Sequence, residues 1–335
     1  MRYLVTGGGG FLGQKLVRRL LDRKDEVVVL GRSRYPQLED WNVPCVQGDV
    51  RDPAAVAKAL QSVQGVFHVA ARVGYWGPRS EYEGINIGGT QALLDGCAEA
   101  GVRHFVYTST PSVAIGPQGD LRGVDETTPY PSRYLSDYGP TKAEAERRVL
   151  AANQDGFFTG ALRPHFIYGP DDPQVAPRLV QRSKQGRIAQ VGDGTNQVDV
   201  CYVDNVVDAH VQLMQALQDE GSSASGQAYF LGDPEPVRLW SFVEQILEGF
   251  GAPPVTKNVS FKAAWRLGYA LEGIYRLLPS SWEPPMTRMA AVILGTNHYF
   301  SHARAAREFG YDPQVTTAEG LERLFRHEAA RTSAT

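Results

Sequence analysis

Tyr138 and Lys142 are four residues apart at the start of a segment, residues 138–150, whose pattern predicts a helix. Side chains at i and i+4 lie on one helical face, so a phenol and an ammonium could meet the same bound molecule. A phenol with a pKa of about 10 is a poor acid at neutral pH, but a neighbouring ammonium lowers that pKa. The pair could therefore pass a proton to a substrate oxygen, although the spacing by itself does not exclude chance.

A glycine-rich turn near the N-terminus offers a site for a dinucleotide. After the apolar run RYLVT, the residues Gly7, Gly10 and Gly13 fit G-x-x-G-x-x-G, and Gly8 with the last two also fits G-x-G-x-x-G. Glycines allow a tight turn and a close approach to a pyrophosphate, whose charge the next helix N-terminus would meet. A plain flexible turn is the alternative. Because strand, glycines, amphipathic helix and second strand follow in this order, we predict dinucleotide binding.

The end of the second predicted strand, VVVLGRSR, bears on the choice between NAD and NADP. An acid at this place holds the ribose 2′-hydroxyl of NAD, whereas a basic residue accepts the 2′-phosphate of NADP. Gly31 stands there, followed by Arg32 and, two residues on, by Arg34. The planar guanidinium of Arg32 suits a phosphate, although the two arginines could also be a solvated pair on a loop. We predict NADP(H) as the cofactor.

Composition excludes several classes of protein. The chain has 335 residues, of which 42% are hydrophobic and 21% charged, and its formal net charge is −3. These values are ordinary for a globular enzyme, and no basic excess suggests a nucleic-acid partner. The three cysteines lack the spacing of a disulfide framework or metal site, so we expect no metal and a reducing, cytoplasmic location. We also expect no signal peptide and no membrane span.

The order of the predicted elements indicates the fold class. Short β-branched runs alternate with helical patterns, which is typical of an α/β protein with a Rossmann-type, doubly wound parallel sheet. The predicted helices cover residues 11–23, 53–60, 82–100, 138–150 and 204–218. We expect an NADP-binding domain at 1–170, with later sheet elements from about 195–232, and a smaller, mostly helical substrate cap at 171–194 and 233–335.

Eight motifs in order resemble the extended short-chain dehydrogenase/reductases across nearly the whole chain: TGGGGFLG, GDVRD, FHVAA, NIGGTQALL, YTSTPSV, YGPTK, RPHFIYGP and YVDNVVDAH. In that family the Tyr-x-x-x-Lys pair is catalytic, which implies that Tyr138 is the proton donor and that Lys142 binds the nicotinamide ribose. The position of the family's catalytic serine falls on Thr110, which keeps the hydroxyl. Ser109 and Ser112 are alternatives, and Thr110 could also cap the following turn.

The resemblance implies further positions, each of which could instead serve packing. Asn86 matches a helix position that supports the active site. Contacts to the cofactor are implied for the first helical turn, the adenine end, the loop after the fourth strand and the nicotinamide end, namely Phe11, Leu12, Asp49, Val50, Ala70, Ala71, Pro164 and Ile167.

Two departures from the family bear on the substrate. Nucleotide-sugar enzymes of this superfamily commonly hold the substrate diphosphate with an asparagine and an arginine, and this sequence has Phe166 and Val198 at those places. Apolar side chains cannot balance a buried diphosphate. We therefore expect a substrate that is not a nucleotide sugar.

Aromatic and aliphatic residues indicate an apolar substrate site instead. We predict substrate contacts from Tyr75, Trp76, Ser112 and Phe166, and an apolar channel completed by Trp265, Leu267, Tyr269 and Leu271 of the amphipathic segment 261–279. Ordinary core packing is the alternative for these side chains. The same segment could also touch a membrane surface from one side.

The motifs YTSTPSV, SFKAAWRLGY, TRMAAVILGTNHYFS and REFGYDPQV are most similar to the 3β-hydroxysteroid dehydrogenase-like branch. Within it the chain most resembles the reductases of 2-alkyl-3-oxoalkanoates in bacterial long-chain olefin biosynthesis. This implies NADPH-dependent reduction of a hydrophobic β-keto acid, with a steroid or sterol dehydrogenase as the alternative and an epimerase as a weaker one. The resemblance also implies two kinds of partner. One is a second copy of the chain in a homodimer, and the other is a set of enzymes of that pathway in an assembly.

Overall fold

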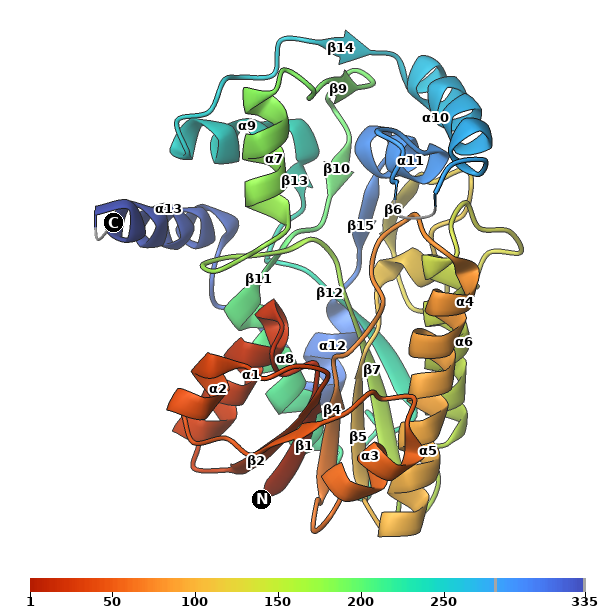
Figure 1. Cartoon of the computed structure of the whole chain (residues 1–335), viewed down its shortest axis with the longest axis vertical. Helices are drawn as coiled ribbons and strands as arrows, with labels where there is room; N and C mark the ends of the chain where they lie inside the picture. The colour runs from red at the N-terminus through yellow and green to blue at the C-terminus, as the bar shows by residue number, and fades with distance from the viewer. Residues whose placement is uncertain (280–281, 334–335) are drawn as a thin grey trace.

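The computed structural model describes residues 1–279 and 282–333. At its centre is a parallel sheet of seven strands in the order β12-β7-β5-β4-β1-β2-β3 (Figure 1). The strands are β1 (Arg2–Thr6), β2 (Glu26–Gly31), β3 (Cys45–Gln47), β4 (Gly65–His68), β5 (His104–Thr108), β7 (Phe158–Pro164) and β12 (Gln227–Leu231). The central strands are buried along nearly their whole length, as expected when helices cover both faces. The predicted Rossmann-type, doubly wound fold is confirmed.

Helices form a layer on each side of this sheet (Figure 1). One face packs against α1 (Phe11–Asp22), α2 (Pro36–Asp40), α8 (Val203–Ala216) and α12 (Ala303–Phe309). The other face packs against α3 (Pro53–Ala59), α5 (Gly89–Ala100) and α6 (Tyr138–Ala151). The apolar sides of these amphipathic helices and the β-branched strand residues make two buried cores, one on each face.

The helix predicted over residues 82–100 differs from the expectation. The structure has three consecutive segments there: α4 (Arg79–Tyr82), a π-helical turn (Glu83–Gly88) and α5. A π-helical turn widens the backbone by one residue and is frequent at functional sites. This turn contains Asn86, one of the residues predicted to support the active site.

The remaining elements lie beyond the carboxyl ends of the parallel strands (Figure 1). They include the helices α7 (Val175–Lys184), α9 (Leu239–Gly249), α10 (Phe261–Tyr275), α11 (Arg288–Gly295) and α13 (Thr317–Ser333). A four-stranded sheet joins β13 (Val237–Arg238), β10 (Gln197–Val198), β15 (His298–Phe300) and β6 (Leu121–Val124). Two strand pairs complete the region: β11 (Cys201–Tyr202) with β8 (Ile167–Tyr168), and β14 (Asn258–Val259) with β9 (Gln190–Val191). A mostly helical C-terminal region was predicted, and the small sheets were not.

The expected domain limits stay a prediction. In the structure, β6 comes from the first half of the chain but pairs in the small sheet, whereas β12 returns from the second half to the central one. The range predicted for the cap also includes residues 280–281 and 334–335, which lie outside the described residues. Among the helices of residues 1–279 and 282–333, none has both the length and the apolar character required to cross a bilayer.

Candidate active site

The turn between β1 and α1 has the shape of a phosphate cradle. Gly7 has a φ of +71°, and its carbonyl oxygen accepts a hydrogen bond of 2.9 Å from the amide of Gly10. A Cβ on Gly13 would lie 2.1 Å from that oxygen, so no larger residue fits. Helix α1 starts after Gly10 without a side-chain cap and without an acid in its first turn. Its free N–H groups and dipole therefore suit a bound pyrophosphate.

A tyrosine that no sequence motif indicated lies beside the glycine-rich turn. The ring of Tyr35 lies between the glycine loop and the end of β2: a Cβ on Gly9 would be 2.1 Å from it, and one on Gly31 2.6 Å. Arg32 is exposed beside it. An exposed arginine next to a strand end without an acid fits the 2′-phosphate of NADP.

Asp49, for which a contact with the adenine is predicted, forms an ion pair with Arg51. Its carboxylate accepts hydrogen bonds of 2.8 Å from both Nε and Nη2 of Arg51, whose hydrogen bonds lower the pKa of Asp49, and the charge of Arg32 lowers it further. Val50 is buried in the core between the central sheet and the helices α3, α5 and α6. Their contacts with a cofactor stay predictions, as do those of Phe11, Leu12, Ala71, Pro164 and Ile167.

Lys142 lies inside the protein, one helical turn after Tyr138. Its side chain is almost fully buried, its Nζ donates a 2.7 Å hydrogen bond to the carbonyl oxygen of Thr108, and it lies 4.1 Å from the centre of the Tyr107 ring. Burial lowers the pKa of Lys142 to about 7, and the negative charge of Glu146 acts in the opposite direction. The ammonium of Lys142 therefore loses its proton more easily than that of an ordinary lysine.

Tyr138 is the first residue of α6, and three other hydroxyl groups gather around it. Burial raises the pKa of Tyr138, Tyr75 adds to that effect, and a hydrogen bond with Thr110 lowers it. The rings of Tyr75 and Tyr138 meet edge to face with centroids 6.2 Å apart. Burial also raises the pKa of Tyr75, whose hydroxyl bonds with Ser112. The predicted residues Tyr138, Thr110, Tyr75 and Ser112 thus meet in one place.

The three alternative hydroxyls after β5 take different roles. Thr110 reaches Tyr138 and also accepts a 3.2 Å hydrogen bond from the amide of Ser112, so it caps the short 3₁₀ turn Pro111–Val113 as well. Ser109 is buried toward Glu146 and lowers the pKa of that acid. The geometry therefore favours Thr110 as the third catalytic hydroxyl, and this role stays a prediction.

Asn86 connects the loop after β4 to the helix that carries the catalytic pair. Its side chain is buried, with Nδ2 donating to Oγ1 of Thr141 at 3.2 Å and to the carbonyl oxygen of Arg72 at 3.1 Å. Its Oδ1 accepts from the amide of Arg72 at 2.8 Å. Thr141 precedes Lys142 directly, so Asn86 fixes the first turn of α6.

A buried chain of hydrogen bonds extends from Asn86 to the cofactor loop. Thr90 donates to the carbonyl oxygen of Asn86 at 2.6 Å, so it must accept from Nε2 of His68 at 2.9 Å. Nδ1 of His68 must then accept from Oγ1 of Thr6 at 2.7 Å, and this oxygen accepts from the amide of Ala70 at 3.2 Å. Burial and, secondarily, Lys142 lower the pKa of His68 to about 3, so the ring is neutral.

The start of this chain meets the glycine loop. A Cβ on Gly7 would lie 2.8 Å from the amide nitrogen of Ala70, so the two backbones touch. One directed chain of donors therefore joins the backbone beside Gly7, where the cofactor phosphates are predicted, to the base of the catalytic helix. The sequence did not indicate this role for His68.

A buried ion pair lies behind the catalytic helix and was also not foreseen. Glu146 accepts from Nη2 of Arg163 at 2.6 Å and from its Nε at 3.0 Å, and Tyr130 donates its hydroxyl to the same carboxylate at 2.5 Å. Burial by itself would raise the pKa of Glu146, but the charge and hydrogen bonds of Arg163 outweigh it and keep that pKa low. The pair fixes α6 against β7.

Apolar side chains from distant segments meet beside the four hydroxyls. Tyr75 and Phe166 both pack against one buried cluster, which consists of Ile115, Met289, Val292 and Ile293. Phe166 stacks on His165 with ring centroids 4.1 Å apart. Trp76 is half-buried, and its carbonyl oxygen accepts a 3.0 Å hydrogen bond from the hydroxyl of Tyr82. Their contacts with a substrate stay predictions.

The expected contribution of α10 to an enclosed channel is wrong in part. Trp265 packs against the core of the C-terminal region, but Leu267 is 53% and Tyr269 62% exposed. Leu267 points away because the helix turns its Gly268 and Glu272 face toward α11, and the exposed ring of Tyr269 stacks on Trp265 beneath the guanidinium of Arg288. They therefore cannot line a buried channel.

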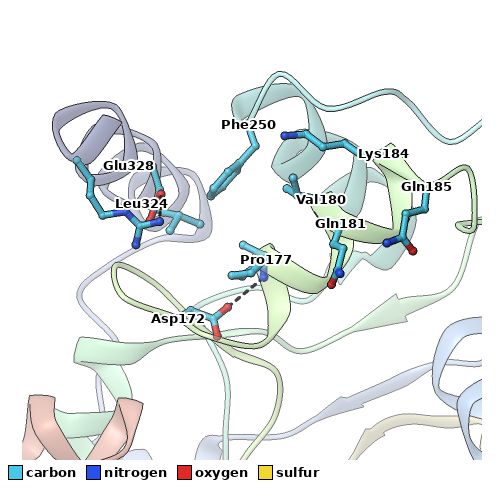
Figure 2. Close-up of a pocket in the computed structure, with 11 residues that line it drawn as sticks. Asp172, Pro177, Val180, Gln181, Lys184, Gln185, Phe250, Leu324 and Glu328 are labelled. Atoms are coloured by element: carbon cyan, nitrogen blue, oxygen red, sulfur yellow. Dashed lines mark hydrogen bonds and ion pairs between the residues drawn. The ribbon is translucent and has the colours of Figure 1, made fainter. Parts of the chain in front are cut away.

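A hollow of about 440 Å³ lies elsewhere, between α7, the end of α9 and α13 (Figure 2). Its floor is apolar, with Val180, Phe250 and Leu324, and its rim is polar. Asp172 at its edge accepts hydrogen bonds from the amides that open α7. None of the predicted site residues lines this hollow, so we locate the active site by the hydroxyl groups around Tyr138.

Replacing Lys142 with Met should change how stability depends on pH. The folded-state pKa of about 7 lies below the ordinary value of 10.5, so between these values the unfolded chain binds one proton more than the folded protein. The free energy of unfolding of the wild type, minus that of the variant, should be flat below about pH 7 and then rise by up to about 1.4 kcal/mol per pH unit. Urea unfolding of the cofactor-free proteins measures this, and a flat difference up to pH 10 would contradict it.

Comparison with known proteins identifies relatives over the full length. Residues 4–262 match the model of the 3-beta hydroxysteroid dehydrogenase/isomerase family. A 2-alkyl-3-oxoalkanoate reductase of Stenotrophomonas maltophilia is 46% identical over 98% of this chain and 100% of the relative, and one of Shewanella oneidensis is 40% identical over 96% and 84%. The structure of MoeE5 with UDP-glucuronic acid and NAD has a TM-score of 0.74 at 27% identity, covering 99% and 100%.

Proposed function

The chain belongs to the 3-beta hydroxysteroid dehydrogenase/isomerase family of NAD(P)-dependent oxidoreductases, and from this premise we propose that it reduces the keto group of a hydrophobic 2-alkyl-3-oxoalkanoate with NADPH. The observation that carries the proposal is the position of Tyr138 and Thr110 next to Tyr75 and the apolar cluster that also contacts Phe166. Proton donors beside an apolar wall suit a carbonyl group attached to alkyl chains. The names of the two bacterial relatives support the same substrate class.

In this mechanism the protein positions the carbonyl group and supplies a proton. The bound nicotinamide cofactor would supply the hydride. Tyr138 donates its phenolic proton to the carbonyl oxygen as negative charge develops there, and the hydroxyl of Thr110 stabilises the same oxygen. The ammonium of Lys142, one helical turn after Tyr138 and bonded to the carbonyl oxygen of Thr108, stabilises the phenolate that remains. The apolar cluster excludes water from the alkyl substituents.

The preference for NADPH is the first test of this proposal. Replacing Arg32 with Ala removes a charged hydrogen-bond donor to the 2′-phosphate, so NADPH affinity should fall by about tenfold or more. NADH affinity should hardly change, because NADH has no such phosphate. Fluorescence titration of both cofactors measures this, with Arg34→Ala as a matched control that removes a nearby exposed arginine. Equal wild-type affinities for NADPH and NADH would refute the cofactor assignment.

Substrate length provides the second test. If methylenes bind against the cluster around Met289 and Ile293, each should contribute up to about 0.8 kcal/mol, which is about fourfold in kcat/KM, until the site is full. The measurement is NADPH oxidation with a series of 3-keto acids of increasing chain length. A kcat/KM that does not change with chain length would contradict a lipid substrate, whereas the assignment as an oxidoreductase would still stand.

A hydrophobic 3β-hydroxysteroid or sterol is the second candidate, favoured by the family match and by the same apolar cluster. Oxidation of a 3β-hydroxysteroid with NAD(P), combined with inactivity on every linear 3-keto acid, would select it. A nucleotide sugar is less suited. Phe166 lies among apolar side chains and Val198 is fully buried, so neither position offers a partner for a diphosphate.

A further inference from the structure

The outer face of α10 and the turn after it carry exposed apolar side chains. Leu277 is 88% and Trp282 57% exposed, and we call the whole group the α10 ridge: Leu267, Tyr269, Ile274, Leu277, Leu278 and Trp282. Leu267 and Ile274 are seven residues apart and therefore share one side of α10, and Leu277 lies in the turn that follows. Apolar side chains gathered in one exposed patch mark an interaction surface, whereas single exposed ones are ordinary.

The packing of α10 keeps this side outward. On the opposite side, a Cβ on Gly268 would lie 2.5 Å from the carbonyl carbon of Thr287, so the helix touches the start of α11 directly. Glu272 is buried there, accepts a 2.7 Å hydrogen bond from the amide of Arg288 and pairs with its guanidinium at 2.7 Å. Turning the ridge inward would break a buried ion pair, which is strongly unfavourable. Figure 1 shows α10 at the outer rim, beyond α11.

The charged side chains that α10 and its C-terminal turn expose are all cations. Lys262, Arg266 and Arg276 are exposed, whereas the acid within α10, Glu272, is buried against Arg288. One exposed acid, Glu283, directly follows Trp282 at the end of the ridge. The whole chain has a net charge of −3, so this cationic border is a local feature. An apolar helix face bordered by Lys and Arg is typical of helices that lie in the interface of a membrane with anionic lipids.

We propose that the α10 ridge docks this protein onto the surface of a lipid membrane that contains anionic head groups. The contact is peripheral, since no helix within residues 1–279 and 282–333 could span a bilayer. A second copy of the chain fits this face less well. A two-fold interface would bring this face against the same face of the other copy, where Lys262, Arg266 and Arg276 would find no exposed acid of α10 to pair with.

The ridge adjoins the loop that carries Tyr75. Phe261, the first residue of α10, packs against the same buried cluster as Tyr75. Burial raises the pKa of the Tyr82 phenol, Arg72 lowers it, and the carboxylate of Glu283 raises it again. The hydroxyl of Tyr82 donates to the carbonyl oxygen of Gly74 at 2.9 Å. Docking would therefore turn the Tyr75 loop toward the lipid. For a hydrophobic substrate, a step that rests on the proposed function, this gives a short route from the bilayer.

Cosedimentation with lipid vesicles tests the docking without any substrate. The protein should bind vesicles of phosphatidylcholine with roughly a third phosphatidylglycerol, more weakly at high salt, and should bind pure phosphatidylcholine less. Replacing both Leu277 and Trp282 with Ser should lower the partition coefficient by about tenfold per side chain. Unchanged circular dichroism and NADPH affinity would show that this variant is folded.

The charge component is tested by a pair of matched variants. Changing Lys262, Arg266 and Arg276 to Gln should weaken binding to the anionic vesicles by about fivefold per cation. The control removes the same charge from exposed sites elsewhere, through Arg18→Gln, Arg147→Gln and Arg326→Gln, and should keep most of the binding. Equal losses in both triple variants would overturn the local role of the α10 cations.

Three further outcomes would overturn the proposal. These are equal vesicle binding by the wild type and the Leu277→Ser/Trp282→Ser variant, equal binding to anionic and neutral vesicles, and a dimer in light scattering that this variant abolishes while vesicles bind nothing. The last result would assign the ridge to a second copy of the chain. Failure of vesicle binding would leave the proposed reductase activity untouched, because that activity is measured on dissolved substrates.

Discussion

Turnover by the Tyr138→Phe variant should be lower than that of the wild type by about 10² or more, because the change removes the proton donor and leaves the ring in place. The ring packs edge to face against Tyr75, and a phenylalanine keeps this contact. NADPH affinity and thermal stability should therefore change little. Single-turnover measurement of NADPH oxidation separates the chemical step from binding.

The neighbouring phenol supplies the control for this prediction. The hydroxyl of Tyr75 hydrogen-bonds with Ser112, and Tyr75 is not part of α6, the helix that begins with Tyr138. Tyr75→Phe should therefore reduce turnover much less than Tyr138→Phe. Full turnover by the Tyr138 variant would show that another acid protonates the substrate. Tyr75 and Thr110 would then be the first groups to examine, since both lie against Tyr138.

Replacing Arg163 with Met should destabilise the protein by about 3–5 kcal/mol, because it leaves the carboxylate of Glu146 buried without its partner. Both side chains of this pair are almost fully buried, at 5% and 0% exposure. The loss should shrink at low pH, where Glu146 of the variant can take up a proton and become neutral. Urea unfolding at neutral and acid pH measures both effects.

An exposed ion pair is the matched control for this substitution. Arg326 pairs with Glu322 on α13, and both side chains are more than two-thirds exposed. Arg326→Met should cost no more than about 1 kcal/mol. A loss for Arg163→Met as small as that of the control would mean that the buried pair does not hold α6 against β7.

Local spacing was enough to predict the catalytic helix and the cofactor turn. Tyr138 and Lys142 lie one helical turn apart, and the cradle at Gly7 and Gly13 depends on a few consecutive residues between one strand and one helix. Parallel strands could be expected from continuous apolar runs, because burial on both faces removes the alternation of polar and apolar residues. These features need no knowledge of which strands are neighbours.

The hydrogen bonds and the ion pair that sequence reasoning missed join segments that are distant along the chain. The link from Thr6 through His68 to Thr90 requires β1, β4 and α5 to be neighbours, and the pair of Glu146 with Arg163 requires α6 to pack on β7. Most of these residues stand within the quoted motifs, but a motif does not say which distant segment its side chains contact. Exposure of the α10 ridge was equally hidden, because an amphipathic pattern does not say which face a neighbour will cover.

The position of the Tyr35 ring bears on how cofactor preference could change during evolution. An acid at the end of β2 is the usual means of selecting NAD. In this chain, Gly31→Asp would place a Cβ 2.6 Å from the Tyr35 ring, so the ring must move or shrink before the acid can be accommodated. An acid at position 31 is therefore accommodated only if the Tyr35 ring swings out of its place or a smaller side chain replaces it. Under the proposed preference for NADPH, the place of this ring sets how readily a single substitution at position 31 could reverse that preference.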